Sequence, residues 1–426
     1  MKKNNFGFKS WCVAALSSFI LLTSCNKDLE NFATIPTPVY PSGTTMGRTI
    51  ASNPNDSLWY RMLLRSGLVN QFNDSTRTFT VFAVDNAGMK VFVNAATGGF
   101  IPLSAPDVDF SRFLSGTYPV PPVNLSQTSA AGIISYNTIG QLYPFAKFGS
   151  AFPNMPLPSL IQLDPINTPF LRMTICPSNS SPFKYVNNIP ATGQIDQAVS
   201  NGMLHHTFTV VAPPTTLLKG LIANKANLTY FRAAIQRADS GQAPGTGRLD
   251  SLLNFGALNM TVLAPSDAAF QTLVFGLAFG AATAQGAPPA LATTIANGAV
   301  AAGPAFLGTN NITTAQVRGI IAYHFLATRP SATASFSPNV RVFTPNVPST
   351  PTLVTTLVNG SIAAHPGIRA LATFTGPTAT TVSFTGLGTF PPGGAAFSGT
   401  AATVIDRDNH AVNGVFHIID RVLLPQ

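Results

Sequence analysis

Charged side chains are scarce in this chain. They make up 9% of its 426 residues, against about 25% in an average soluble domain. The 24 basic residues outnumber the 15 acidic ones, but they are scattered, with no basic run and no alternation of basic and aromatic residues. This pattern is typical of a dispersed, solvated surface, and we therefore expect no nucleic-acid partner.

Cysteine is almost as rare, with only Cys12, Cys25 and Cys176 present. The N-terminal segment discussed below predicts that Cys12 is removed and that Cys25 carries lipid, which leaves one thiol. A single thiol cannot form an internal disulfide. A reactive thiol needs exposure and a lowered pKa, and the sequence indicates neither. We expect Cys176 to be a small, buried, apolar residue.

Motifs for catalysis and metal binding are missing as well. The spacings HExxH, CxxC, GxSxG and GxxxxGK[S/T] do not occur, and the few carboxylates are not paired. His205 and His206 are neighbours in a predicted strand, so they point to opposite faces and are poorly placed to ligate one metal. The sequence predicts no enzyme, no metal site and no cofactor.

Apolar residues, by contrast, are plentiful. They form 45% of the chain, which also contains 31 Phe, 34 Gly and 35 Pro. Disorder goes with low hydrophobicity and high charge, so this composition indicates a folded protein instead. Low charge together with many Gly and Pro residues favours a strand- and loop-rich extracellular protein.

The N-terminus has three parts in register. Lys2, Lys3 and Lys9 precede a short apolar run at residues 11–22, which is followed by Leu22-Thr23-Ser24-Cys25. The run is shorter than the about 20 residues that span a bilayer. The last four residues resemble the lipobox of bacterial lipoproteins. This resemblance implies that residues 1–24 are a signal peptide and that Cys25 receives diacylglycerol and acyl chains such as palmitate.

Lipid on Cys25 would make a membrane the first partner of the chain. No later apolar run is expected to span, so the lipid is the anchor. Asp28 and Glu30 resemble the surface-export tag of Bacteroidetes lipoproteins, which implies the outer membrane and its outer surface, with the periplasmic face as the alternative. Residues 25–50 contain Pro36 and Pro38 and are predicted to form an extended tether.

Three short segments occur twice, in the same order. The pairs are TVFAVDNA (80–87) and TVLAPSDA (261–268), IISYN (133–137) and IIAYH (320–324), and NGMLH (201–205) and NGVFH (413–417). One such match could arise by chance, but three in order indicate an internal repeat.

Each segment also predicts local structure. The β-branched run at residues 261–264 predicts a strand, and Ser266 predicts the N-cap of a following helix, with Asp85 in the same place in the first copy. Leu58, Met62 and Leu63 indicate an amphipathic helix upstream. We expect three leucines to play that part in the second copy: Leu252, Leu253 and Leu258. The Asn-Gly at 413–414 predicts a turn into a buried closing strand.

The repeated motifs resemble those of fasciclin-type (FAS1) domains. TVLAPSDAAF at 261–270 and NGVFHIIDRVLLP at 413–425 match closely, and the segments at 80–89 and 201–213 match less well. The resemblance implies an α+β fold of two tandem domains, each a β-sandwich or wedge with several short helices. The first is expected over residues 51–213 and the second over 215–426. Three stretches exceed a compact domain and are expected to be long loop insertions: 100–190, 276–312 and 328–400, the last with extra hairpins.

The family's central Tyr-His motif corresponds to Tyr323 and His324 in the second copy and to Tyr136 and Asn137 in the first. His205 and His417, in the closing strands, complete the set of candidate residues. Two interpretations are open for all six residues. They contact a ligand, or they pack inside the domain.

The resemblance implies a non-enzymatic adhesion or binding module whose ligand is an extracellular protein or a glycan. An alternative is a glycan-capture or nutrient-uptake accessory that works beside an outer-membrane transporter. A third hypothesis is a spacer that has no ligand.

Overall fold

The computed structural model describes residues 43–120, 124–150, 152–180, 183–245, 247–308, 312–329, 331–387 and 399–425. The predicted signal peptide, Cys25 and the tether as far as residue 42 lie outside these ranges. Pro41–Gln426 form one compact unit. We use "repeat 1" for the described residues up to 213 and "repeat 2" for those from 215 onwards; the domain boundaries themselves stay predictions.

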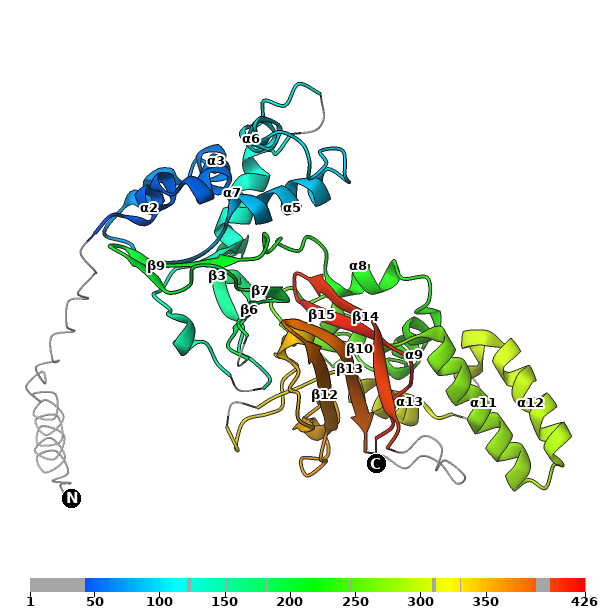
Figure 1. Ribbon diagram of the computed structural model, residues 1–426. Helices are drawn as coiled ribbons and strands as arrows, with labels where there is room; N and C mark the ends of the chain where they lie inside the picture. Colours follow the sequence, from blue (N-terminus) through cyan, green and yellow to red (C-terminus); the bar gives the residue numbers. More distant parts are fainter. Residues whose placement is uncertain are drawn as a thin grey trace, which may run out of the picture. The chain divides into compact units, whose positions relative to one another are not determined.

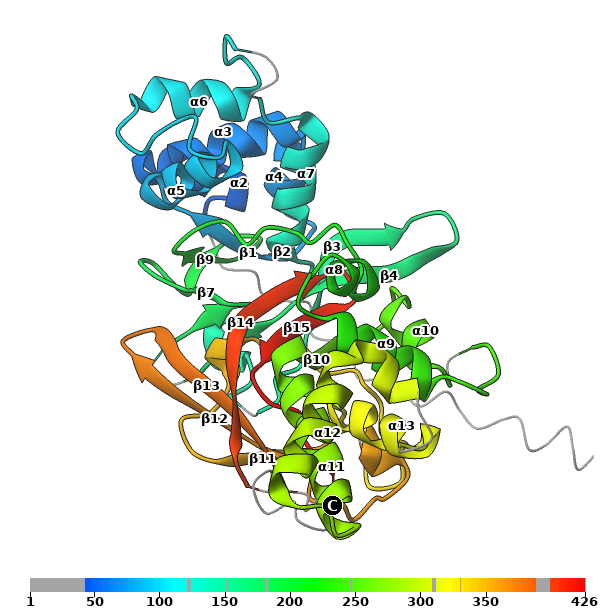
Figure 2. The same cartoon turned by 90° about the vertical axis from the view of Figure 1, so that its right-hand side faces the viewer.

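The elements of repeat 1 are, in chain order, α2 (Met46–Ser52), η1 (Pro54–Asp56), α3 (Ser57–Ser66), α4 (Val69–Asn73), β1 (Phe79–Val84), α5 (Asn86–Ala96), α6 (Asp107–Ser115), α7 (Gln127–Tyr136), β2 (Thr138–Ile139), η2 (Phe145–Lys147), β3 (Leu157–Asp164), β4 (Thr168–Ile175), β5 (Pro177–Ser178), β6 (Tyr185–Val186), β7 (Ile189–Pro190), β8 (Gln197–Val199) and β9 (Gly202–Thr207). Its main sheet has the order β4-β3-β2-β1-β9-β8, and β5-β6-β7 form a small separate sheet. The helices α2 to α7 lie on one side of the main sheet (Figure 2).

The elements of repeat 2 are α8 (Leu218–Ala223), α9 (Thr229–Ala238), α10 (Leu249–Leu253), β10 (Met260–Pro265), α11 (Asp267–Ala284), α12 (Pro289–Ala301), η3 (Gly303–Gly308), α13 (Thr314–Tyr323), η4 (Thr344–Asn346), β11 (Thr352–Val354), η5 (Leu357–Gly360), β12 (Ile368–Thr375), β13 (Thr378–Gly386), β14 (Ala401–Ala411) and β15 (Gly414–Ile419). Its sheet has the order β10-β15-β14-β13-β12-β11 (Figure 1). The mixture of sheets and helices confirms the predicted α+β class.

The repeat seen in the sequence is also a repeat of topology. In repeat 1, β1 pairs with β9 in parallel, starting at Phe79 opposite Gly202. In repeat 2, β10 pairs with β15 in parallel, starting at Met260 opposite Gly414. Every residue of all four strands except Met203 is buried. The duplicated motifs thus form the same parallel strand pair in both halves.

A buried asparagine fixes the start of each closing strand. In repeat 1, Asn201 Oδ1 accepts from the first backbone N–H of α2 at 2.7 Å, and its Nδ2 donates to the Phe72 carbonyl at the end of α4 at 2.9 Å. Asn413 in repeat 2 accepts from the first N–H of α8 at 2.8 Å and donates to the Leu253 carbonyl at the end of α10 at 3.0 Å. These matching bonds identify α8 as the counterpart of α2, and α10 as that of α4.

The glycine after each asparagine allows the closing strand to approach its partner. Gly202 and Gly414 have φ of 154° and 157°, a region that side-chain-bearing residues rarely adopt. A Cβ at Gly202 would lie 1.9 Å from the Phe79 carbonyl oxygen, and one at Gly414 would lie 2.2 Å from that of Met260. Glycine is therefore required at both positions.

The predicted helix caps are confirmed. Asp85 Oδ1 accepts from the Gly88 N–H at the start of α5, and Ser266 Oγ accepts from the Ala269 N–H at the start of α11. The predicted amphipathic helix around Leu58 is also confirmed, as α3, with its apolar face buried.

The counterpart of α3 in repeat 2 differs from the prediction. α3 packs on α7 in repeat 1, and α9 packs on α13 in repeat 2. The helix that contains Leu252 and Leu253 is α10, the counterpart of α4. The prediction was wrong because the three leucines form the more conspicuous apolar cluster, although α9 has a regular amphipathic pattern with Tyr230, Phe231, Ala234, Ile235 and Ala238 buried.

Three expectations about irregular segments are also corrected. The stretch expected as a loop insertion at 100–190 contains α6, α7 and β2 to β7, so it is part of the fold of repeat 1. The predicted tether is wrong over its last five residues, because Met46 and Ile50 bury their side chains and the chain is helical there as α2. The insertion expected as a loop at 276–312 is mainly helical, because α11 runs to Ala284 and α12 packs back against it. Alanine, its commonest residue, favours helix. The extra hairpin expected in 328–400 is confirmed as β12 and β13.

One helix among the described residues, α11, is long and apolar enough to cross a membrane, judged by length and composition alone. This differs from the expectation that no run after Cys25 would qualify. The first half of α11 lies in the core of repeat 2, where Phe270, Leu273 and Val274 are buried.

Candidate functional site

Tyr323 and His324, the Tyr-His motif of repeat 2, lie at the C-terminal end of α13 and are completely buried. A capping box between Thr313 and Gln316 fixes the start of this helix. The Tyr323 hydroxyl donates to the Gly367 carbonyl at 2.5 Å and accepts from the backbone N–H of Leu387 at 3.1 Å. Burial raises the pKa of Tyr323 to about 12, so the hydroxyl keeps its proton.

His324 has a backbone partner on each ring nitrogen. Nδ1 lies 2.7 Å from the Ile320 carbonyl, to which it donates, and Nε2 accepts from the Leu423 N–H at 2.9 Å. This arrangement requires the neutral imidazole with its proton on Nδ1. Burial lowers the pKa of His324 to about 4. The side chain joins α13 to the C-terminal segment and has no free nitrogen for a ligand.

Tyr136 and Asn137 occupy the same place in repeat 1 and are also completely buried. Asn137 Nδ2 donates to the carbonyls of Ile133 and Val211, both at 2.9 Å. These partners correspond in position to those of His324. Ile133, like Ile320, lies one helical turn back in the same helix, and Val211, like Leu423, follows the closing strand. Asn137 Oδ1 has no hydrogen-bond partner among the described residues.

His205 and His417 are equivalent in their contacts. Each Nδ1 accepts a backbone N–H, from Asp196 at 3.0 Å and from Asp408 at 3.1 Å. Each Nε2 donates to a carbonyl, that of Tyr143 at 2.9 Å for His205 and that of Val342 at 3.0 Å for His417. Both aspartates have positive φ, 59° and 55°. His417 thus contacts β14 at the irregularity between Asp406 and Asn409, and His205 contacts the residue just before β8.

All six candidate residues thus face inward and bind the chain's own groups. These contacts favour packing over ligand contact for the Tyr-His motif, its Tyr-Asn counterpart and the two strand histidines. Cys176 is buried and free, as predicted, and burial raises the pKa of its thiol to about 12. In the described part of the chain, no group of three or more His, Cys, Asp or Glu side chains is placed to hold a metal ion.

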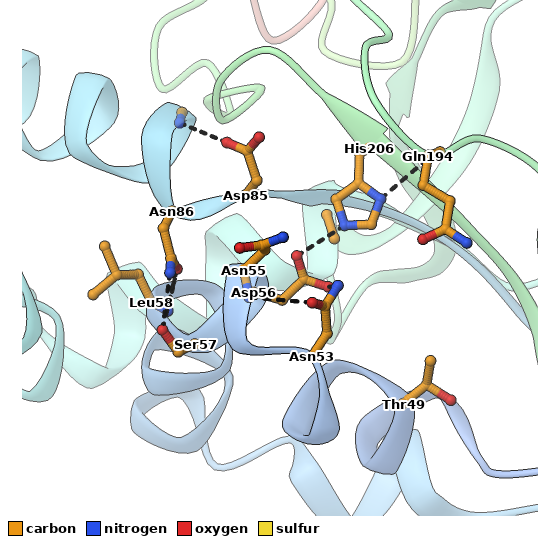
Figure 3. A network of polar contacts seen from close by, with 12 residues as sticks. Thr49, Asn53, Asn55, Asp56, Ser57, Leu58, Asp85, Asn86, Gln194 and His206 are labelled. Atoms are coloured by element: carbon orange, nitrogen blue, oxygen red, sulfur yellow. Dashed lines mark hydrogen bonds and ion pairs between the residues drawn. The ribbon is translucent and has the colours of Figure 1, made fainter.

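Sequence reasoning missed a buried ion pair in repeat 1 (Figure 3). His206 points away from His205, and its Nε2 lies 3.0 Å from Asp56 Oδ1, while its Nδ1 lies 3.0 Å from the Gln194 carbonyl. Asn53 Nδ2 donates to the other Asp56 oxygen at 2.9 Å. Because both ring nitrogens of His206 face acceptors, the arrangement suits the imidazolium.

The pKa of His206 agrees with that geometry. Burial by itself lowers this pKa, but the hydrogen bond and the negative charge of Asp56 outweigh burial, with smaller contributions from the Gln194 carbonyl and Asp85. The net effect is a raised pKa. No local sequence signal predicts the pair, since its two residues are 150 positions apart.

In repeat 2 the same two positions are apolar. Leu228 precedes α9 as Asp56 precedes α3, and Ile418 follows His417 as His206 follows His205. Leu228 and Ile418 are both buried. The two repeats therefore fill one structural position with an ion pair in one case and with hydrocarbon in the other.

A second polar cluster joins the two repeats. Arg341, fully buried, donates from Nη1 to His410 Nε2 at 3.0 Å and from Nη2 to the Val412 carbonyl at 2.8 Å. It also reaches repeat 1 at the Thr174 carbonyl, 3.3 Å away. The Tyr136 hydroxyl donates to that carbonyl at 2.9 Å and lies 3.3 Å from His410 Nε2.

The cluster suits a neutral histidine. Burial and the positive charge of Arg341 lower the pKa of His410 well below its ordinary value, so Nε2 accepts. No carboxylate pairs with Arg341 within the described ranges, and its Nε has no hydrogen-bond partner there. The cluster is enclosed between the repeats, which suits it to joining them and not to binding a solute.

Exposed apolar groups occur on elements that differ between the repeats. The β3–β4 hairpin, at the edge of the repeat 1 sheet, carries Ile166 and Phe170, which are 87% and 94% exposed. In repeat 2, α12 carries Leu291 and Ile295, about half exposed. A shallow depression on repeat 1 is lined by five side chains, none of them acidic: Arg61, Leu64, Arg65, Ser115 and Gln127.

The sequence matches no protein-family model and none of the curated proteins. Among solved structures it is similar to a FAS1 domain pair from the insect cell adhesion molecule fasciclin I, with a TM-score of 0.31 and 12% sequence identity. The match covers 86% of this chain and 95% of that one. Membership in the fasciclin-type family therefore remains a resemblance carried by the sequence motifs.

Proposed function

We propose that this chain is a lipoprotein, anchored by Cys25 to the outer membrane and exposed at the cell surface, that acts as a non-enzymatic adhesion or binding module. The support is the lipobox-like N-terminus, the repeated fasciclin-type motifs and the way the structure uses their residues. The ligand is an extracellular protein or glycan.

One observation carries the proposal of a binding module without catalysis. The histidines and tyrosines of the repeated motifs, which would be the natural catalytic candidates, are buried and hydrogen-bonded to the chain itself. Chemistry on an external substrate needs groups that reach it. The chemically versatile groups of the repeats thus maintain the scaffold, and recognition is left to exposed elements.

The β3–β4 hairpin is the best candidate for such an element in repeat 1. Ile166 and Phe170 are almost fully exposed, and Phe is enriched among the contact residues of protein interfaces. By contrast Trp59, the aromatic side chain best suited to stack on a sugar ring, is buried in the core of repeat 1. We therefore propose adhesion ahead of glycan capture.

The test is a matrix-protein and glycan array probed with the 41–426 fragment, which contains the whole compact unit. We expect saturable binding that the double variant Ile166→Ser/Phe170→Ser weakens at least about tenfold, because each lost anchor removes one to two kcal/mol, roughly, of apolar burial. The matched control is Leu353→Ser/Ile362→Ser, two apolar residues of repeat 2 that are about half exposed.

Binding that survives the hairpin variant would contradict this assignment, and an array with no saturable binding would favour a spacer. Anchoring is tested separately on whole cells. The mature protein should carry an acyl mass increment on Cys25, and a Cys25→Ser variant should leave the membrane fraction. External protease should digest the wild-type protein on intact cells if it is surface-exposed.

A further inference from the structure

The hairpin formed by α11 and α12 carries no charge after its first residue, Asp267. No Asp, Glu, Lys, Arg or His occurs between Asp267 and Arg318, a stretch that includes the rest of α11 and all of α12. An average segment of that length in a soluble domain would carry about twelve Asp, Glu, Lys or Arg residues. α5 and α6, which follow β1 in repeat 1, carry charge instead, including the ion pair between Lys90 and Asp107 at 2.6 Å.

The hairpin is attached to the fold at one end only. Phe270, Leu273 and Val274 bury the first half of α11 in the core of repeat 2, and Ala296 attaches the C-terminal part of α12 to the same core. Figure 1 shows the second half of α11 and the first half of α12 projecting side by side from the sheet. Small residues hold the two helices together: Ala278 and Ala282 are buried on α11, and Ala292 and Ala296 on α12. This close packing leaves the larger apolar side chains on the outside.

The exposed apolar face of the hairpin lies on α12. Leu291 and Ile295 are four residues apart, so they lie on the same face of α12, and they are 51% and 45% exposed. On α11, Phe275 and Phe279 are also four apart and stacked with ring centroids 6.0 Å apart, but they pack against the core of repeat 2 and are not part of this exposed face.

Four threonine hydroxyls of the hairpin have hydrogen-bond partners within their own helices. Each hydroxyl donates to the carbonyl one helical turn back: Thr272 to Ala268, Thr283 to Phe279, Thr293 to Pro289 and Thr294 to Ala290, at distances of 2.8 to 3.0 Å. Such back-bonding satisfies a hydroxyl inside an apolar environment. A protein partner would typically meet a polar, partly charged rim, and this hairpin lacks the charged part of such a rim.

We propose that the distal part of the α11–α12 hairpin inserts shallowly into the surface of a lipid bilayer, as a second membrane contact beside the predicted lipid anchor. The hairpin contacts the outer part of the acyl-chain region of the bilayer. It does not bind charged headgroups, because its distal part carries no charge. α11 does not span the membrane, because its first half is committed to the core of repeat 2. The proposal is independent of the adhesion ligand and of lipid on Cys25.

The test is co-flotation of the unlipidated 41–426 fragment with vesicles of phosphatidylcholine alone. Zwitterionic lipid is needed because the 41–426 fragment is basic, with 20 basic and 13 acidic residues and a net charge of +7, and would bind anionic vesicles without insertion. We expect the fragment to float, with a partition coefficient that is insensitive to salt. Leu291→Ser/Ile295→Ser should lower that coefficient at least about tenfold, because it removes two apolar anchors. The control Leu353→Ser/Ile405→Ser, with residues of similar exposure in repeat 2, should leave it unchanged.

A spectroscopic readout supplements flotation. Leu291→Trp should show a blue-shifted emission on adding vesicles, against the constant signal of buried Trp59. Absence of flotation at millimolar lipid, an equal loss in the control variant, or binding that requires anionic lipid and disappears in salt would overturn the proposal. So would concentration-dependent dimerisation abolished by Leu291→Ser/Ile295→Ser without any flotation, because the face would then bind a second copy. None of these results bears on the array experiment with the β3–β4 hairpin.

Discussion

The two repeats use the same backbone framework but fill it with different chemistry. Both keep the parallel strand pair, the asparagine and glycine at the closing turn, and the strand histidine. Repeat 1 then places Asp56 against His206 where repeat 2 places Leu228 and Ile418. The comparison teaches that backbone hydrogen bonding determines this framework, while the core position between the first long helix and the closing strand tolerates either ions or hydrocarbon.

The largest change in the free energy of unfolding is expected at the closing-turn glycine, which both repeats share. Gly202→Ala and Gly414→Ala should each lower the free energy of unfolding by more than about 4 kcal/mol, because the new Cβ meets a backbone carbonyl and the φ angle is unfavourable. Urea unfolding of both variants measures this. Gly298→Ala, in the open interior of α12, should instead stabilise by about 0.5–1 kcal/mol. A small loss at either turn glycine would show that its repeat does not need the close approach.

The second-largest change in the free energy of unfolding is expected at the Asp56–His206 ion pair, which is where the two repeats differ. Asp56→Ala leaves a buried His206 without its counter-charge, so we expect a loss of about 3–5 kcal/mol. Leu228→Ala, at the matching position in repeat 2, should lose about 2–5 kcal/mol through its cavity. The double variant Asp56→Leu/His206→Ile, which copies repeat 2 into repeat 1, should be neutral or stabilising by about 1–4 kcal/mol.

Hydrogen exchange of the β9 amides localises these changes to repeat 1. If the double variant is as unstable as Asp56→Ala, the apolar pair of repeat 2 is not a valid substitute in repeat 1. The two positions would then be equivalent in topology, but the residues packed around them would differ.

The smallest effect is the pH dependence, which should have opposite signs in the two repeats. The pKa of His206 is raised, so its contribution to stability is complete below its unfolded value of about 6.5 and is lost as pH rises through the folded pKa. The groups that face it are Asp56, Asp85 and the Gln194 carbonyl. The pKa of His324 is lowered to about 4, so its repeat loses up to about 3 kcal/mol as pH falls from 6.5 to 4.

Urea unfolding between pH 4 and 9 measures both slopes. Asp56→Leu/His206→Ile should remove the decline on the alkaline side, and His324→Asn, which copies Asn137 of repeat 1, should reduce the decline on the acid side. An alkaline decline that persists in the double variant would mean that another group causes it.

Much of this structure could be predicted because its signals are local. The strand at β10 follows from β-branched residues, the caps at Asp85 and Ser266 from their side chains, and the closing turns from Asn-Gly. The repeat itself needed only the order of three motifs. The candidate residues were found by the same motifs, but their inward orientation was left open between two interpretations.

The sequence by itself thus determined the α+β class, the duplication and the residues that start and stop its elements, because these depend on neighbours within about ten positions. Only the tertiary structure decided which side chains meet. Asp56 reaches His206, and Arg341 reaches the Thr174 carbonyl, across more than a hundred positions. Contacts of that kind are set by sheet register and packing, and no local pattern encodes them. The same holds for the hairpin at α11 and α12, whose exposure follows from where the core of repeat 2 ends.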